Sequence, residues 1–122
     1  MPSANELKIR EMLKGMLNLK LFVIFSQGKG LDLKPYLADH LQYMVDLERK
    51  GKLFASGPFG NPTRGDGMTI VRAADIDEAR EVGRVFGIIV RGIRTFTIQP
   101  WTVMEGSLTF TVNFSDKTSS IA

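Results

Sequence analysis

The stretch "LKLFVIFS", Leu19 to Ser26, carries the strongest structural signal in the sequence. Its apolar residues are mostly branched or aromatic, and they occupy both alternating sets of positions, so that a strand here is apolar on both faces. This pattern is typical of a central strand that is buried on both sides of a sheet. Glycines at positions 28 and 30 predict the end of the strand.

Helix and strand signals alternate on the C-terminal side of this strand. Apolar residues at helical spacing predict helices at about 35–50 and 76–86, the second of them preceded by an Asp75–Glu78 capping signature. Apolar runs predict the remaining strands, at 52–56, 68–73 and 95–101. A Ser3–Glu6 capping box predicts a further helix at about 4–17. Clean alternation predicts a strand at about 107–115, which we expect at an edge of the sheet.

Without the N-terminal helix and the last strand, the order of elements is βαββαβ. This order predicts an α+β fold of the ferredoxin-like class, an antiparallel sheet with both helices on one face. Residues 1–122 are expected to form a single domain with a core at about 19–102. The second, apolar face of such a sheet needs a cover, and a second copy of the sheet is the simplest one. We therefore predict a homodimer through the sheet face.

Composition excludes several classes of protein. The chain is 43% hydrophobic and 24% charged and has no cysteine and one histidine, so we expect neither a disulfide framework nor a metal site. No phosphate loop or other cofactor motif is present, and none is predicted. The net charge of +3 comes without a dense basic run, which argues against a nucleic-acid partner. The sequence lacks a signal peptide or an apolar run that could span a membrane, so we predict a cytoplasmic protein.

An RNA-recognition module would share the βαββαβ order, but its third strand carries aromatic side chains on which bases stack. Asp66 and Met68 stand at those positions here. RNA binding is therefore not expected.

His40 is the first candidate for chemistry. At 100° per residue it falls at the rim of the buried face of the helix at 35–50, between Tyr36 and Tyr43. An imidazole that is partly desolvated and still borders a cleft suits a general acid or base near neutral pH. The alternative is a packed histidine whose nitrogens are satisfied.

The long connection Gly57–Gly67 and the strand before it supply two further candidates. The connection is too long for a simple hairpin, and we interpret it as a wall of a cleft opposite His40. Asp66 in this connection is the carboxylate that could orient His40, although Asp next to Gly is also ordinary turn chemistry. Ser56, at the end of the preceding strand, could donate a hydrogen bond to a ligand.

The block "DHLQYMVDLERKGKLFASGPF" resembles the YCII-related domain family (YciI-like proteins). A helix histidine, a glycine eleven residues later, a short apolar strand and a Ser-Gly-Pro match in type and spacing, and the likeness covers about residues 20–102. The resemblance implies a dimeric α+β barrel. It also implies that His40 is the proton-transfer residue of an enzyme that isomerises or eliminates small, often hydroxylated aromatic compounds.

Arg84-Val85-Phe86 stands where members of that family commonly carry Asp-Pro-Phe. Arg84 would lower the pKa of the histidine or hold an anionic substrate. By this resemblance we predict a lyase- or isomerase-type enzyme with His40 as a catalytic residue and with Asp66 as the catalytic acid in place of the one that is missing. Its small anionic or phenolic substrate would contact Tyr43, Ser56, Phe59 and Arg84. The alternative is a ligand-binding or dimerisation module that performs no reaction.

Overall fold

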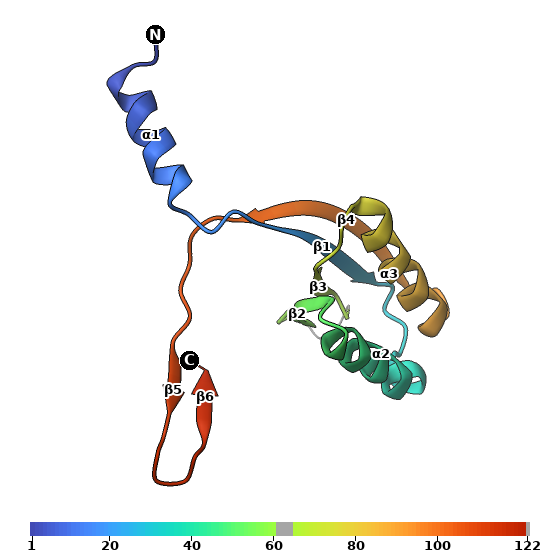
Figure 1. Cartoon of the computed structure of the whole chain (residues 1–122). Coiled ribbons are helices and arrows are strands. Elements are labelled where there is room, and N and C mark those ends of the chain that lie inside the picture. Colours follow the sequence, from blue (N-terminus) through green and yellow to red (C-terminus); the bar gives the residue numbers. More distant parts are fainter. Residues whose placement is uncertain (61–64, 122) are drawn as a thin grey trace. The chain divides into compact units, whose positions relative to one another are not determined.

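The computed structural model describes residues 1–60 and 65–121 (Figure 1). The chain divides into two compact units, one of residues Lys20–Thr102 and one of Met1–Leu19 with Val103–Ala122. The predicted core, about 19–102, has nearly the bounds of the first unit. No helix among the described residues is both long and apolar enough to cross a membrane.

The first unit is a mixed α+β structure around a four-stranded sheet. Its elements, in chain order, are β1 (Leu19–Gly28), a 3-10 turn η1 (Lys34–Tyr36), α2 (Leu37–Arg49), β2 (Leu53–Pro58), β3 (Gly67–Val71), α3 (Ile76–Ile89) and β4 (Arg94–Val103). The strand order is β2-β3-β1-β4, and β3 pairs antiparallel with both β1 and β2. The strands and helices predicted between residues 19 and 102 are thus all present.

Both helices pack on one face of the sheet (Figure 1). The apolar side chains that meet there form one buried cluster: Ile24, Met44, Leu47, Val71, Ala79, Val82, Phe86 and Val90. The α3 helix begins as the sequence predicts, because the Asp75 side chain accepts a hydrogen bond from the Glu78 amide at 2.9 Å. The Glu78 side chain in turn accepts a hydrogen bond, at 3.0 Å, from the amide of Ala74, which precedes the helix.

The opposite face of the sheet is apolar as well. Since Val23 lies directly opposite Ile70 in the register and both alternate with residues of the helix-facing cluster, they point to this second face. Leu21, Val23 and Ile70 are only 1%, 5% and 6% exposed. Strand β1 therefore buries side chains on both of its faces, as its sequence predicts.

The second unit contains α1 (Ala4–Lys14) and a two-stranded sheet of β5 (Phe110–Val112) and β6 (Ser119–Ile121). The predicted cap of α1 is present, because the Ser3 hydroxyl accepts from the Glu6 amide at 3.1 Å. The expectation that residues 107–115 form an edge of the main sheet is wrong. Asp116 accepts hydrogen bonds from the amide and hydroxyl of Thr118, at 3.0 and 2.7 Å, and this local turn folds β5 back onto β6.

Candidate functional site

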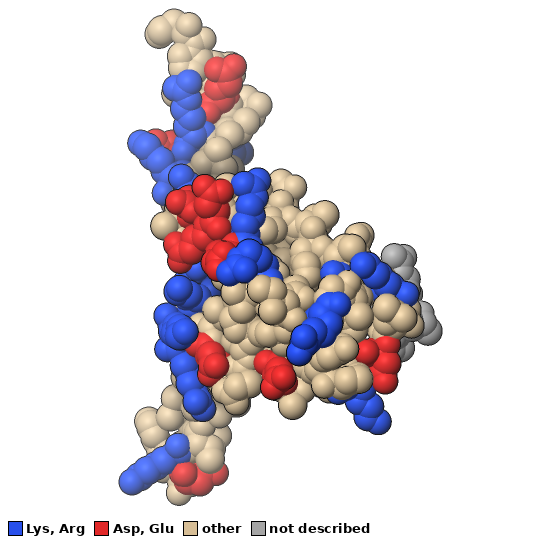
Figure 2. Space-filling model, turned by 90° about the vertical axis from the view of Figure 1, so that its right-hand side faces the viewer, with Lys and Arg blue, Asp and Glu red and all other residues tan. Residues whose placement is uncertain are grey.

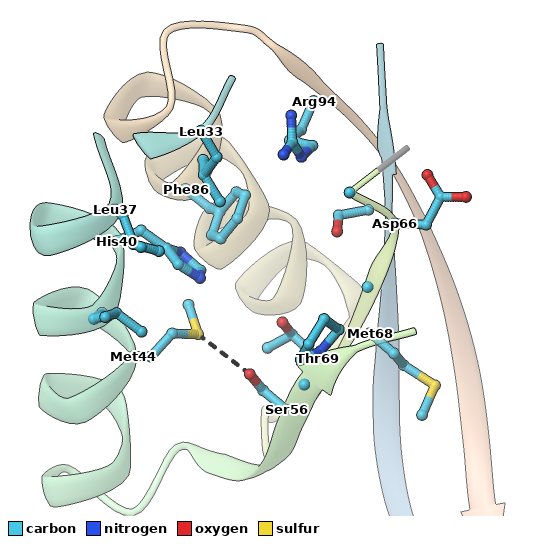
Figure 3. Close-up of a pocket in the computed structure, with 16 residues that line it drawn as sticks. Leu33, Leu37, His40, Met44, Ser56, Asp66, Met68, Thr69, Phe86 and Arg94 are labelled. Atoms are coloured by element: carbon cyan, nitrogen blue, oxygen red, sulfur yellow. Dashed lines mark hydrogen bonds between the residues drawn. The ribbon is translucent and has the colours of Figure 1, made fainter. Parts of the chain in front are cut away.

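A cavity of about 360 Å³ lies between α2 and the helix-facing side of the sheet (Figure 3). Most of its wall is apolar. Its polar side chains are Ser26, His40, Ser56, Asp66, Thr69 and Arg94, and its other walls come from Leu33, Leu37, Leu41, Met44, Gly57, Pro58, Gly65, Gly67, Met68 and Phe86. Both ends of the long connection Gly57–Gly67 line the cavity, and residues 61–64 of it lie outside the described residues.

His40 enters this cavity from α2 and is half-buried. Its ring meets the ring of Phe86 edge to face, with centroids 4.6 Å apart and an interplanar angle of 86°. Its Nδ1 atom is buried and has no hydrogen-bond partner among the described residues. A buried polar atom without a partner is rare in folded proteins, and it distinguishes His40 from a packed histidine whose nitrogens are both satisfied.

The surroundings of His40 keep its imidazole neutral. Burial lowers the pKa of His40 below the usual 6.5, and the positive charge of Arg94 lowers this pKa further. At neutral pH the ring therefore carries one N–H and one free lone pair, the state that can accept a proton.

Arg94 is the second polar group of consequence in the cavity wall, and the sequence did not point to it. It opens β4 and is only 7% exposed, which is unusual for a charged side chain. Its Nη1 donates to the carbonyl of Ile93 at 3.2 Å. Within residues 1–60 and 65–121, no carboxylate forms an ion pair with this guanidinium.

A periodic signal for Arg94 does exist in the sequence. Arg94, Phe96 and Ile98 stand at alternate positions of β4, and the last two pack against the helix-facing core. Period-2 alternation therefore places Arg94 on the same face. A Lys or Arg that shares the alternate positions of a strand with core residues indicates a buried charge.

Asp66 lies in the cavity wall, but its described bonds hold strand ends together. Its Oδ1 accepts from the Gly28 amide at 2.8 Å, and its carbonyl accepts from the Phe59 amide at 2.9 Å. Figure 3 shows the carboxylate directed away from His40. The pairing of Asp66 with His40 therefore stays a prediction, and the turn role is the one with described contacts.

Of the predicted substrate-binding residues, Ser56 lines the cavity and the other three do not. The Ser56 hydroxyl donates a long hydrogen bond of 3.8 Å to the sulfur of Met44. The Tyr43 hydroxyl donates to the carbonyl of Val82 at 3.2 Å and so joins α2 to α3. Phe59 is 44% exposed beyond the end of β2.

Arg84 lies on the solvent side of α3. Its Nε donates to Glu81 Oε2 at 2.8 Å, one helical turn away. The neighbouring residues Val82, Gly83 and Phe86 occupy the buried side of the helix, which leaves position 84 facing outward. The arginine that borders the cavity with His40 is Arg94.

No family model matches the chain. Its sequence is similar to that of the uncharacterized protein YjpA of Bacillus subtilis (strain 168), with 26% identity over 70 residues, which are 57% of this chain and 80% of YjpA. No solved structure matches the chain. The resemblance to the YCII-related family stays a prediction.

The described residues contain no group of three or more His, Asp or Glu side chains placed to hold a metal ion. The polar groups of the cavity suit other chemistry. They combine one neutral imidazole, one buried guanidinium, the carboxylate of Asp66 and a few hydroxyls in a mostly apolar wall, which is a composition typical of sites for small organic ligands.

Proposed function

We propose that this chain is a YCII-like enzyme that binds a small anionic or phenolic molecule in the cavity and moves a proton on it with His40. The observation that carries the proposal is the state of His40. It is a half-buried, neutral imidazole with an unpartnered Nδ1, and it borders an apolar cavity that also holds a buried cation. Perturbed titratable groups that converge on a cavity are candidates for catalysis.

The arrangement of the elements supports the ferredoxin-like part of this proposal. A βαββαβ chain whose sheet runs β2-β3-β1-β4, with both helices on one face, agrees with that fold. In this arrangement α2 and the first residues of β4 border the same cavity, so that His40 and Arg94 come from elements far apart in the chain.

The reaction class follows from what a neutral imidazole can do. It removes a proton from an acidic C–H or O–H of the ligand and, as imidazolium, returns it to another atom, which amounts to an isomerisation or assists an elimination. A ligand anion beside Arg94 would favour the charged state of the ring during this transfer.

We expect His40 to titrate below pH 6.5 in the folded chain, which NMR of its ring protons measures directly. Because its pKa is lowered on folding, the unfolded chain binds a proton first as the pH falls. The stability that depends on neutral His40 is full above about pH 6.5 and declines as the pH falls toward the folded pKa. His40→Phe should remove this part of the pH dependence, and a pKa at or above 6.5 in the folded chain would contradict the proposal.

The second candidate function is a binding module that uses the same cavity without a reaction. The Tyr43 hydroxyl donates to the Val82 carbonyl, and the His40 ring packs against Phe86. Packed side chains make contacts of this kind, so both contacts favour a module without a reaction. Such a module would bind ligands but leave their exchangeable C–H positions unchanged in D₂O. Deuterium uptake therefore separates the two functions.

We also propose that the chain forms a homodimer through the second face of the sheet. By alternation with Val23 and Ile70, this second face also carries Phe25 and Met68, which lie opposite each other in the register and are only partly buried. The face with α2 and α3, in contrast, carries acidic side chains beside basic ones (Figure 2). Trp101 of β4 is 43% exposed and, by alternation, lies on this second face. Light scattering at micromolar concentration should show a dimer, and Trp101→Lys should shift it toward monomer. A wild-type chain that is monomeric throughout would contradict this interface.

A further inference from the structure

We infer that Arg94 is the anchor for a carboxylate group of the ligand, and that the cavity selects small monocarboxylates over neutral molecules of the same shape. This inference rests on the proposed function, since it concerns the same cavity, and it names the class of ligand. Two features carry it: the burial of Arg94 and the closeness of the Gly65 backbone to its guanidinium.

The burial of Arg94 leaves most of its hydrogen-bonding capacity to something other than the described chain. A guanidinium has five N–H donors, and the described side-chain bond uses one of them, from Nη1 to the Ile93 carbonyl. Buried charges in proteins are normally paired, because an isolated one is costly to remove from water. A ligand carboxylate would supply both the missing charge and two acceptors in the bidentate geometry that suits arginine.

Gly65 lies directly against the guanidinium of Arg94. A Cβ atom at position 65 would come within 2.5 Å of Arg94 Nη2 and 3.0 Å of its Cζ. Gly65 also has a positive φ of +70°, a conformation that disfavours other residues. The chain thus packs its own backbone against one side of the guanidinium, while the side chain borders the cavity in which His40 lies (Figure 3).

The charge of the cavity wall favours a monoanion. Among the described lining residues Arg94 is the one Lys or Arg, and Asp66 is the one carboxylate, whose Oδ1 accepts from the Gly28 amide. His40 is neutral at pH 7. A phosphate dianion usually needs several cations or a helix N-terminus. A phenol is uncharged at pH 7, so it would not offset the buried charge. A single carboxylate on an otherwise apolar molecule matches one guanidinium and an apolar wall.

Binding of a carboxylate would also change the basicity of His40. The positive charge of Arg94 lowers the pKa of this histidine, and a bound carboxylate would offset that charge. The pKa of His40 is then expected to rise when the ligand binds. The anchor would thereby make the imidazole a stronger base only when the cavity is occupied.

The test uses pairs of probes that differ in charge and little in shape: benzoate with benzamide, and 4-hydroxybenzoate with 4-hydroxybenzamide. Binding to the full-length chain is measured by NMR titration at pH 7. Each carboxylate should bind more tightly than its amide by about 10- to 100-fold, the value of a buried charge-assisted pair. Arg94→Met should remove this preference and leave the amide affinity unchanged, whereas Arg94→Lys should keep part of it.

Arg80→Gln is the matched control, because Arg80 is an exposed arginine that pairs with Asp77 on α3. It should bind both probes as the wild type does. Gly65→Ala is a second variant, which keeps the charge of Arg94 but displaces the guanidinium, and it should weaken carboxylate binding more than amide binding. The His40 resonances add a readout that packing alone would not give. The pKa of His40 should rise with benzoate in the wild type and should not respond in Arg94→Met.

Amides that bind as tightly as carboxylates, absence of binding by either probe at millimolar concentration, or undiminished carboxylate binding in both Arg94→Met and Gly65→Ala would each overturn the inference. The proposed function fails in a different way. If carboxylates bind through Arg94 but no compound takes up deuterium in a His40-dependent manner, the inference about Arg94 is supported and the proposed enzymatic function is contradicted. If His40-dependent exchange occurs only on neutral compounds, the proposed enzymatic function is supported and the inference about Arg94 is contradicted.

Discussion

Truncation of Phe86 to alanine is expected to lower the free energy of unfolding by about 3–5 kcal/mol. Phe86 is 8% exposed and contacts two other rings edge to face, His40 at 4.6 Å and Phe96 at 4.8 Å between centroids. It therefore joins α2, α3 and β4 at the wall of the cavity. Removal of the ring takes away both its buried area and these contacts, and the remaining space enlarges an existing cavity. Urea unfolding followed by circular dichroism measures the loss.

Two further variants on α3 serve as controls for Phe86→Ala. Ile88→Ala, on the same helix but at a side chain that is 60% exposed, should change the stability by less than about 0.5 kcal/mol. Phe86→Leu should cost less than Phe86→Ala, because it keeps most of the apolar volume. In Phe86→Ala the pKa of His40 should also move back toward 6.5, since water enters beside the ring. A stability loss below about 1 kcal/mol would show that Phe86 is not part of the core.

The elements of the first unit could be predicted because their signals are local. The apolar run of β1 and the Asp75 cap of α3 lie in single short segments. The place of His40 at the rim of the buried face of α2 follows from helical periodicity alone. These features need no knowledge of what packs against them.

The parts that the sequence did not reveal depend on contacts between distant segments. Residues 107–115 alternate as an edge strand would, but the pairing of β5 with β6 is fixed by the turn at Asp116 and not by the alternation. The carboxylate of Asp66 bonds to the amide of Gly28, 38 residues away, and no local pattern sets that choice.

The arginine that borders the cavity with His40 also depends on contacts between distant segments. The resemblance to the YCII-related family points to Arg84, yet helical phase directs this side chain to solvent, where it pairs with Glu81. Arg94 is more than 50 residues from His40 in the sequence and reaches the cavity through the pairing of the strands. Only its phase with Phe96 and Ile98 marks it, and that signal has meaning once β4 is known to face the helices.

Replacement of His40 by glutamine is expected to slow deuterium uptake from D₂O into C–H positions of bound small acids by about 10²- to 10⁴-fold, the usual contribution of a general base. Small carboxylic acids with a C–H position next to a carbonyl group, such as 2-oxo acids, are suitable probes, and NMR follows the loss of their proton signals. Glutamine keeps polar atoms in the cavity but cannot accept a proton at neutral pH. Asp39→Asn is the matched control, because Asp39 is exposed on the neighbouring position of α2 and lies about 100° away.

The pH dependence of this exchange ties His40 to Arg94. At low concentration of the probe, the pH dependence of the exchange rate reports the pKa of His40 in the free chain. The rate should therefore rise with pH and reach a plateau, with a midpoint below pH 6.5. At saturating concentration of a carboxylate the rate follows the complex, and its pKa should be higher, because the carboxylate offsets the charge of Arg94. In Arg94→Met the two profiles should coincide. Exchange in His40→Gln at the wild-type rate, or a free-chain profile without a pKa below 6.5, would show that another group moves the proton.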